Sequence, residues 1–368
     1  MNNRTKKLIA VTLILLVCTL VGNLIVTQPI LNRGIVIGMG VDETEDGETE
    51  VTVQIAVAGE SSAPGAPNRY ALVSGKADTL LGAMERIARV TAYKPAYFHC
   101  HMLIFGERIV LNGILEAAKQ LFIEDSVMDD VAVMAVSGSA KETLKKSVSM
   151  QGASSVYLQQ LNKINSTASG QPSVTLKNLI THFETEGYTP YLPWVEAVPV
   201  PKAVGGADTG GDEQNYAFDC SKTVLFHEDG KGVVESETIT EAISLTSSKG
   251  GMMISVRTEE GTLDVNVKRS LRYWSIAEDG VITFRAVYFV SVVAENVTRD
   301  MTEISNEYVT KEVEKHIRST LESSYAIVAP DKIDPFSLEG KFHKKFGTKK
   351  EPENLSLRLD VTVKRSDC

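Results

Sequence analysis

Residues 32–43 read NRGIVIGMGVDE, and this stretch decides how the chain begins to fold. An apolar run leads into Gly-Met-Gly with Asp42 two residues beyond, much as the first strand of a nucleotide-binding fold leads into its glycine-rich turn. The third glycine of that motif would fall where this chain has Glu43. Four more acids within 44–50 would repel a diphosphate, and the next segment alternates like a strand. We therefore interpret the stretch as a strand that turns at Gly40 and Asp42, with no cofactor.

The segment before this strand predicts a membrane anchor. A basic flank over 1–7 precedes the uncharged residues 8–26, which as a helix would span about 28 Å, close to the roughly 30 Å hydrocarbon core of a bilayer. We predict an uncleaved helical anchor within 1–28, because no A-x-A cleavage pattern follows it. The basic flank would stay in the cytoplasm, so the remaining chain would lie outside it. A lipid anchor would use Cys18, but the preceding Val17 is β-branched where a lipoprotein signal needs a small residue.

The body of the chain is acidic. The formal net charge is −9, and the three bases before the apolar segment leave 35 Lys and Arg against 47 Asp and Glu after it. Binding to nucleic acid rests on neutralisation of phosphates by Lys and Arg, so this charge excludes nucleic acid as the expected partner. The length of 368 residues predicts two or three domains.

The hydrophobic pattern predicts an α+β fold, a multi-domain ectodomain of mixed sheets with helices packed on them. We predict an N-terminal domain over 33–198, with two subdomains if it splits near 148, then a Pro/Gly-rich linker over 199–215 and a C-terminal domain over 216–366. The C-terminal domain should hold a long hairpin that turns at 278–280 and is covered on both faces in its return strand.

Individual residues give little support for chemistry. His99 and His101 would share one face of a strand with Cys100 on the other, and two ligands without a third make a weak metal site. No nucleophile elbow, H-E-x-x-H or P-loop occurs, so we predict no catalytic, cofactor-binding or metal-ligating residue and no enzyme. Cys100 and Cys220 should be buried free thiols, although an oxidising compartment would permit a disulfide between them.

Ordered blocks of the chain resemble the Ger(x)C proteins, the C subunits of spore germinant receptors. A Gly-x-Asp element ending at Asp42 precedes a V-T-V-Q strand, and a later strand carries His99 and closes on Gly106 and Glu107, as is typical of that family. The blocks that carry the resemblance are IVIGMGVDETEDGETEVTVQIAVAG, SGKADTLLGAMERIARVTAYKPAYFHCHMLIFGERI, KTVLFHEDGKGVVESETITEAISL, VRTEEGTLDVNVKRSLRYW and DKIDPFSLEGKFHKKF.

The resemblance implies a non-enzymatic subunit of a nutrient germinant receptor complex that acts in spore germination. Its implied partners are the membrane, a multi-spanning permease-like subunit and an A-type subunit, at the spore inner membrane if the organism sporulates. Family members usually carry a lipoprotein cysteine where this chain has Leu24, so the helical anchor would replace the lipid. The alternative function is a stand-alone extracytoplasmic solute-binding or sensor protein.

Overall fold

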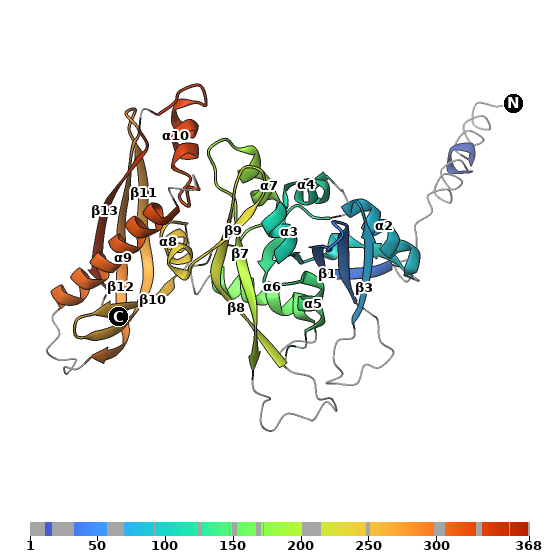
Figure 1. Ribbon diagram of the computed structural model, residues 1–368, viewed down its shortest axis with the longest axis horizontal. Helices are drawn as coiled ribbons and strands as arrows, with labels where there is room; N and C mark the ends of the chain where they lie inside the picture. Colours follow the sequence, from blue (N-terminus) through green and yellow to red (C-terminus); the bar gives the residue numbers. More distant parts are fainter. Residues whose placement is uncertain are drawn as a thin grey trace.

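The structure is a computed structural model. The residues it describes are 12–16, 33–56, 70–91, 93–123, 127–146, 148, 153–166, 171, 173–200, 215–247, 251–297, 306–328, 333–352 and 354–366. Within these ranges no helix is both long enough and apolar enough to cross a membrane. The anchor predicted over 1–28, with Cys18, lies outside the described residues except for 12–16, which are helical and exposed. The fold is mixed α+β, as predicted, and is built on two sheets (Figure 1).

The first sheet has nine strands in the order β3-β2-β1-β5-β6-β7-β8-β9, with β4 paired to β1. Strands β1, β5, β6 and β7 are parallel, and the outer strands join them antiparallel. The bounds are β1 (Arg33–Glu43), β2 (Thr49–Ala56), β3 (Tyr70–Ala77), β4 (Lys94–Ala96), β5 (Met102–Gly106), β6 (Ala132–Val136), β7 (Tyr191–Val200), β8 (Asn215–Phe226) and β9 (Gly232–Glu235).

The opening stretch differs from its prediction at its end. Strand β1 continues through Asp42 to Glu43, which pairs with Thr49 of β2, so the predicted turn at Gly40 and Asp42 is wrong. The turn lies in the acidic loop that follows, where Gly47 adopts the left-handed region with φ +81°. A ladder to β2 on one side and to β5 on the other keeps β1 extended up to its last residue.

Helices cover both faces of this sheet (Figure 1). Helices α2, α3, α4 and α7 contribute to the core on one face, and α5 and α6 contribute to the core on the other. Helix α2 follows β3, and its N-cap is Thr79, whose hydroxyl accepts from the N–H of Gly82. The bounds are α2 (Leu80–Val90), α3 (Glu107–Asn112), α4 (Leu115–Ile123), α5 (Ala140–Lys145), α6 (Ser154–Ile164) and α7 (Leu176–Glu184).

The glycines of β1 allow close packing of helices. A Cβ atom at Gly38 would lie 2.2 Å from the Cβ of Ser155 on α6, and one at Gly40 would lie 2.9 Å from the Cβ of Ala140 on α5. Contacts below 3.0 Å force a shift of the neighbouring helix, so these positions need glycine to bring two helices onto the strand. The pattern that resembles a phosphate-binding turn is therefore a packing surface.

The predicted linker joins two strands of the same sheet. Strands β7 and β8 pair antiparallel from Tyr191–Leu225 to Val200–Asn215, so the segment 201–214 connects the two strands of one hairpin. Strands β8 and β9 thus continue the sheet that the prediction assigned to the domain before the linker. Proline and glycine residues serve a hairpin loop as well as a domain linker, so their content does not identify a domain boundary.

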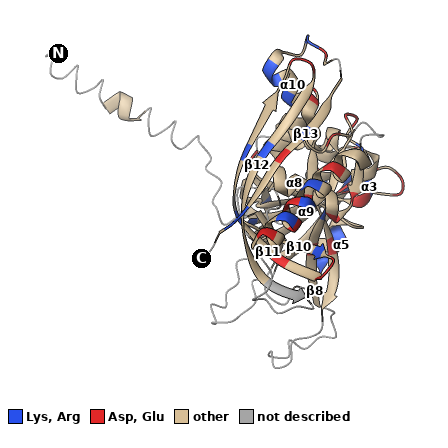
Figure 2. Cartoon of the chain, turned by 90° about the vertical axis from the view of Figure 1, so that its left-hand side faces the viewer, with Lys and Arg blue, Asp and Glu red and all other residues tan. Residues whose placement is uncertain are grey.

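The second sheet has four strands in the order β10-β11-β12-β13. The long hairpin is confirmed: β11 and β12 pair antiparallel up to Ile276 and Ile282, around the predicted turn. Helix α9 covers one face of this sheet and carries charged residues of both signs (Figure 2). The bounds are α8 (Glu237–Ser247), β10 (Met252–Thr258), β11 (Gly261–Ile276), β12 (Val281–Val297), α9 (Asn306–Val328), α10 (Leu338–Phe346) and β13 (Ser356–Arg365).

The opposite face of the second sheet is open. Leu271 is 51% exposed and Tyr273 is 64% exposed, while their neighbours Val287 and Phe289 are half-buried. The prediction that the return strand of the hairpin is covered on both faces is therefore wrong. Apolar residues at both parities of a strand indicate two apolar faces, but they do not reveal whether the chain itself supplies the second cover.

Helix α10 joins the second sheet to the first. The backbone N–H of Gly340 donates to the carbonyl of Gly187 at 2.8 Å, and the N–H of Thr189 donates to the Ser337 hydroxyl at 3.1 Å. A Cβ atom at Gly340 would lie 2.2 Å from Cδ2 of Tyr188, so the helix can approach the turn only with glycine there. We refer to the contact between α10 and the turn 184–190 as the junction.

Candidate functional site

A cleft lies at the carboxyl ends of the central parallel strands. It has a volume of about 520 Å³, and its walls come from 42–45, Glu50, 107–108, 111–112 and 138–139. In open sheets with parallel strands, ligands bind outside the carboxyl ends of the strands, so this is the place where the fold itself favours a site. Most of the ionisable side chains that line the cleft are carboxylates.

Asp42 lies at the base of the cleft and caps α5. One carboxylate oxygen accepts from the N–H of Ala140 at 2.8 Å, and the other accepts from the N–H of Lys141 at 2.9 Å and from the Ser139 hydroxyl at 3.0 Å. A carboxylate at a helix N-terminus satisfies N–H groups that have no partner inside the helix. Burial raises the pKa of Asp42, and the three hydrogen bonds oppose that rise.

The Gly-Glu pair at the end of β5 completes this arrangement. A Cβ atom at Gly106 would lie 1.9 Å from Oδ1 of Asp42, so only glycine leaves room for the carboxylate. The carboxylate of Glu107 accepts from the N–H of Gly138 at 2.7 Å, and the Glu107 N–H donates to the Gly138 carbonyl at 2.7 Å. Two elements of the family resemblance, far apart in sequence, thus fix the start of α5 together.

Gln54, the glutamine of the V-T-V-Q strand, fixes the other end of α5. Its side-chain amide donates to the carbonyl of Leu144 at 2.8 Å and to the Ser154 hydroxyl at 3.0 Å, and its oxygen accepts from the N–H of Ser155 at 3.2 Å. Gln54 is fully buried, and its amide makes these bonds between the end of α5 and the start of α6. Sequence reasoning noted the strand but gave no sign of this contact, because the partners are about 90 to 100 residues away.

The remaining charges of the cleft are largely paired. Glu50 contacts Lys141 at 2.6 Å and Lys76 at 3.8 Å, and Arg108 contacts Glu45 at 3.5 Å. The Ser139 hydroxyl accepts from the N–H of Glu142 as the N-cap of α5. These ion pairs and hydrogen bonds therefore stabilise the walls of the cleft. The rim that faces solvent is acidic, which suits cationic or hydrogen-bonding groups.

The structure places the candidate histidines and cysteines apart from this cleft. Residues 97–99 form a short 3₁₀ helix, not part of a strand, and both His99 and His101 are exposed. Cys100 is buried between them, with its thiol directed to the carbonyl of Met102. Cys100 and Cys220 are both buried free thiols, as predicted, and burial raises the pKa of each to about 12.

The open face of the second sheet is a second candidate surface. Leu271, Tyr273, Val287 and Phe289 lie there on β11 and β12, and we call these four residues the outer patch. The Arg285–Asp360 ion pair, at 3.4 Å, borders it. Apolar side chains that gather on a solvated sheet face are typical of protein contact surfaces.

Comparison with known proteins places these features in context. Residues 27–197 match the family model described as the spore germination protein N-terminal domain. The crystal structure of the GerBC protein is similar to this chain with a TM-score of 0.50 and 13% sequence identity, covering 90% of this chain and 97% of that chain. At this identity the likeness shows a shared fold. Among curated proteins no match is found.

Proposed function

Because the chain belongs to the Ger(x)C family of spore germination proteins, we propose that it is a non-enzymatic, membrane-anchored subunit of a nutrient germinant receptor complex. The observation that carries the proposal is the structural role of the residues that the chain shares with the Ger(x)C proteins. Asp42, Gln54 and Gly106 all act in positioning α5. Residues with this role maintain the fold around α5, and a constant fold is what a subunit needs in order to fit its partners in a complex.

The outer patch supports a role in assembly. Leu271 and Tyr273 are exposed and Val287 and Phe289 are half-buried on this face of the sheet. Burial against a partner would remove their apolar surface from water at about 25 cal/mol per Å². We propose that the patch contacts another subunit of the complex, either the multi-spanning permease-like subunit or the A-type subunit. The acidic ectodomain would then stand on the extracytoplasmic side of the spore inner membrane.

Co-purification from spore membranes tests this proposal. We expect the tagged full-length chain to bring down both other receptor subunits, and the double substitution L271D/Y273D to reduce their recovery at least fivefold. Ile327 is a matched control, because it is 54% exposed on α9, away from the patch, and I327D should leave recovery unchanged. Absence of receptor subunits from the wild-type sample, or normal nutrient germination of spores that lack the gene, would contradict the proposal.

The mode of anchoring has its own test. We propose that residues 1–28 remain attached as a helix, since Val17 precedes Cys18 and the usual lipoprotein cysteine is replaced near Leu24. Mass spectrometry of the membrane-extracted protein should give an intact N-terminal peptide. A diacylglycerol on Cys18 would replace the helical anchor by a lipid.

A stand-alone sensor is the second candidate function, and the cleft favours it. Its volume of about 520 Å³ lies within the range of small-molecule sites. A nutrient present at 100 times its dissociation constant should stabilise the purified chain by about 2.7 kcal/mol. Such stabilisation by an amino acid or sugar, without co-purifying subunits, would favour the sensor over the complex.

A further inference from the structure

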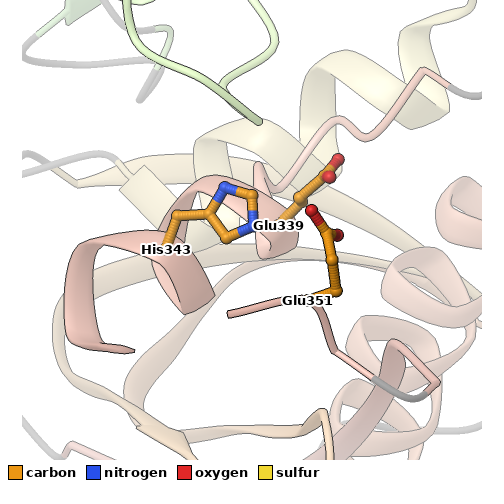
Figure 3. A group of neighbouring side chains, drawn as sticks. All are labelled: Glu339, His343 and Glu351. Atoms are coloured by element: carbon orange, nitrogen blue, oxygen red, sulfur yellow. The ribbon is translucent and has the colours of Figure 1, made fainter. Parts of the chain in front are cut away.

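Helix α10 and the turn after it bring three metal-ligating side chains together. Glu339 and His343 are four residues apart on α10 and so share one side of the helix. Gly347, with φ +87°, ends the helix and reverses the chain, which returns Glu351 to the same side. The ligand atoms of the three residues all lie within 4.8 Å of one another, and Figure 3 shows the imidazole beside the two carboxylates.

The buried imidazole of His343 has no hydrogen-bond partner among the described residues. The residue is only 5% exposed, and neither ring nitrogen has a hydrogen-bond partner among the described residues. Buried side-chain nitrogens are almost always hydrogen-bonded or bound to a metal, so two orphaned nitrogens in one ring point to a missing ligand. This observation is independent of the two carboxylates beside the ring.

The lysines of this segment leave the two carboxylates unpaired. Lys341 is directed to the carbonyl of Phe336, Lys345 donates to the carbonyl of Ile276 at 2.6 Å, and Lys350 pairs with Glu278 at 3.5 Å. In the part of the chain that the structure describes, no ion pair reaches Glu339 or Glu351. The cluster therefore offers two negative charges to a cation although the surrounding sequence is basic.

We propose that Glu339, His343 and Glu351 bind a divalent first-row transition metal ion of the Zn²⁺ class. Imidazole nitrogen suits zinc and its neighbours, whereas calcium and magnesium prefer oxygen ligands alone. Two carboxylates balance the charge of the ion, and three protein ligands leave one tetrahedral position for water. A cavity of about 480 Å³ that is lined by His343, His182 and Thr348 gives the ion a path from solvent.

The position of the site gives the ion a structural effect. Gly340, which donates to Gly187 across the junction, lies between the two α10 ligands in sequence. A bound ion would fasten the last turn of α10 to the chain that follows it, and would fix the helix where it meets the first sheet. The proposal does not depend on the function proposed above.

Metal titration of the untagged full-length chain tests the site. After removal of metals with a chelator, calorimetry with Zn²⁺ should give one equivalent bound at micromolar or lower dissociation constant. Co²⁺ in its place should give the visible absorption of a four-coordinate site. E339Q and E351Q, at exposed positions where folding should be unaffected, should each weaken Zn²⁺ binding at least tenfold.

Glu186 provides the matched control, because it lines the same cavity but is not part of the cluster. E186Q should bind Zn²⁺ as the wild-type chain does. H343N, checked for folding by circular dichroism, should lose the Co²⁺ absorption. Absence of Zn²⁺ binding at 100 µM, equal binding by E351Q and wild type, or preference for Ca²⁺ over Zn²⁺ would each overturn the assignment.

Discussion

The substitution G106A tests the packing of Asp42 against the end of β5. The backbone of Gly106 has φ −71° and ψ 161°, a conformation open to any residue, so the effect must come from the added Cβ atom alone. That atom would lie 1.9 Å from Oδ1 and 3.1 Å from Cγ of Asp42, so Oδ1 would have to move away from the N–H of Ala140.

The expected cost follows from three contributions. Overpacking of a tight site costs about 2 kcal/mol, and loss of one hydrogen bond to a charged group costs about 2 kcal/mol. Replacement of glycine by alanine restricts the unfolded chain and returns about 0.7 kcal/mol. We therefore expect G106A to lower the free energy of unfolding by about 3 kcal/mol.

Urea unfolding can isolate this effect. The chain has two tryptophans, and in a W274F background the fluorescence of the buried Trp194 on β7 reports on the first sheet. The control G251A adds a Cβ atom whose nearest contact is 3.2 Å away, and should cost less than about 1 kcal/mol.

A double-mutant cycle gives the decisive result. When Asp42 is first replaced by alanine, the carboxylate that Cβ would strike is gone, so adding G106A should cost less than about 1 kcal/mol. An equal cost of about 3 kcal/mol in both backgrounds would refute the proposed clash with Asp42.

Three further predictions concern buried polar groups. Q54L should lower the free energy of unfolding by about 3 kcal/mol, because it removes the acceptor of the buried Ser155 N–H on α6 and one of the two donors to the Leu144 carbonyl on α5. Q120M, whose buried oxygen already lacks a partner among the described residues, should change it by less than about 1 kcal/mol in urea titrations. Burial lowers the pKa of Lys341 to about 8, so between pH 8 and about 10.5 the unfolded chain binds more protons and stability should rise with pH. Thermal melting across that range should show the rise, and K341M should flatten it; a parallel rise in K341M would assign it to another group. In a C18S/C368S chain, Cys100 and Cys220 should resist a thiol reagent at pH 8 until denaturant is added, since burial raises the pKa of both to about 12, and rapid labelling of the folded chain would contradict their burial.

Much of the fold could be predicted where the pattern is local. The β1–β2 hairpin, α2, the β11–β12 hairpin and α9 follow from hydrophobic period and turn residues within each segment. The role of Asp42 could not be predicted, because its partners on α5 lie 97 to 99 residues away and a carboxylate at the end of a strand has no local signature of a cap. The hairpin loop after β7 was misinterpreted for a similar reason, since pairing of β7 with β8 is not written in the loop itself.

The cluster of Glu339, His343 and Glu351 could also not be predicted from the sequence. The spacing of Glu339 and His343 was readable, but the approach of Glu351 depends on the chain reversal at Gly347 and on the packing that buries the imidazole. A single histidine in a sequence does not indicate a metal site. His343 becomes a candidate ligand only because the structure buries its ring nitrogens without a hydrogen-bond partner among the described residues.

The junction also imposes an order on biogenesis. Its hydrogen bonds join positions 148 and 145 residues apart, so the turn at Gly187 leaves the ribosome well before α10 exists. At 5–20 residues per second the delay is roughly 7 to 30 s. During that interval the turn 184–190 has no α10 to cover it. Closure by α10 requires that synthesis has passed Phe346. A product truncated before Gly340 would therefore expose the uncovered turn to the proteases and chaperones that remove unfinished chains.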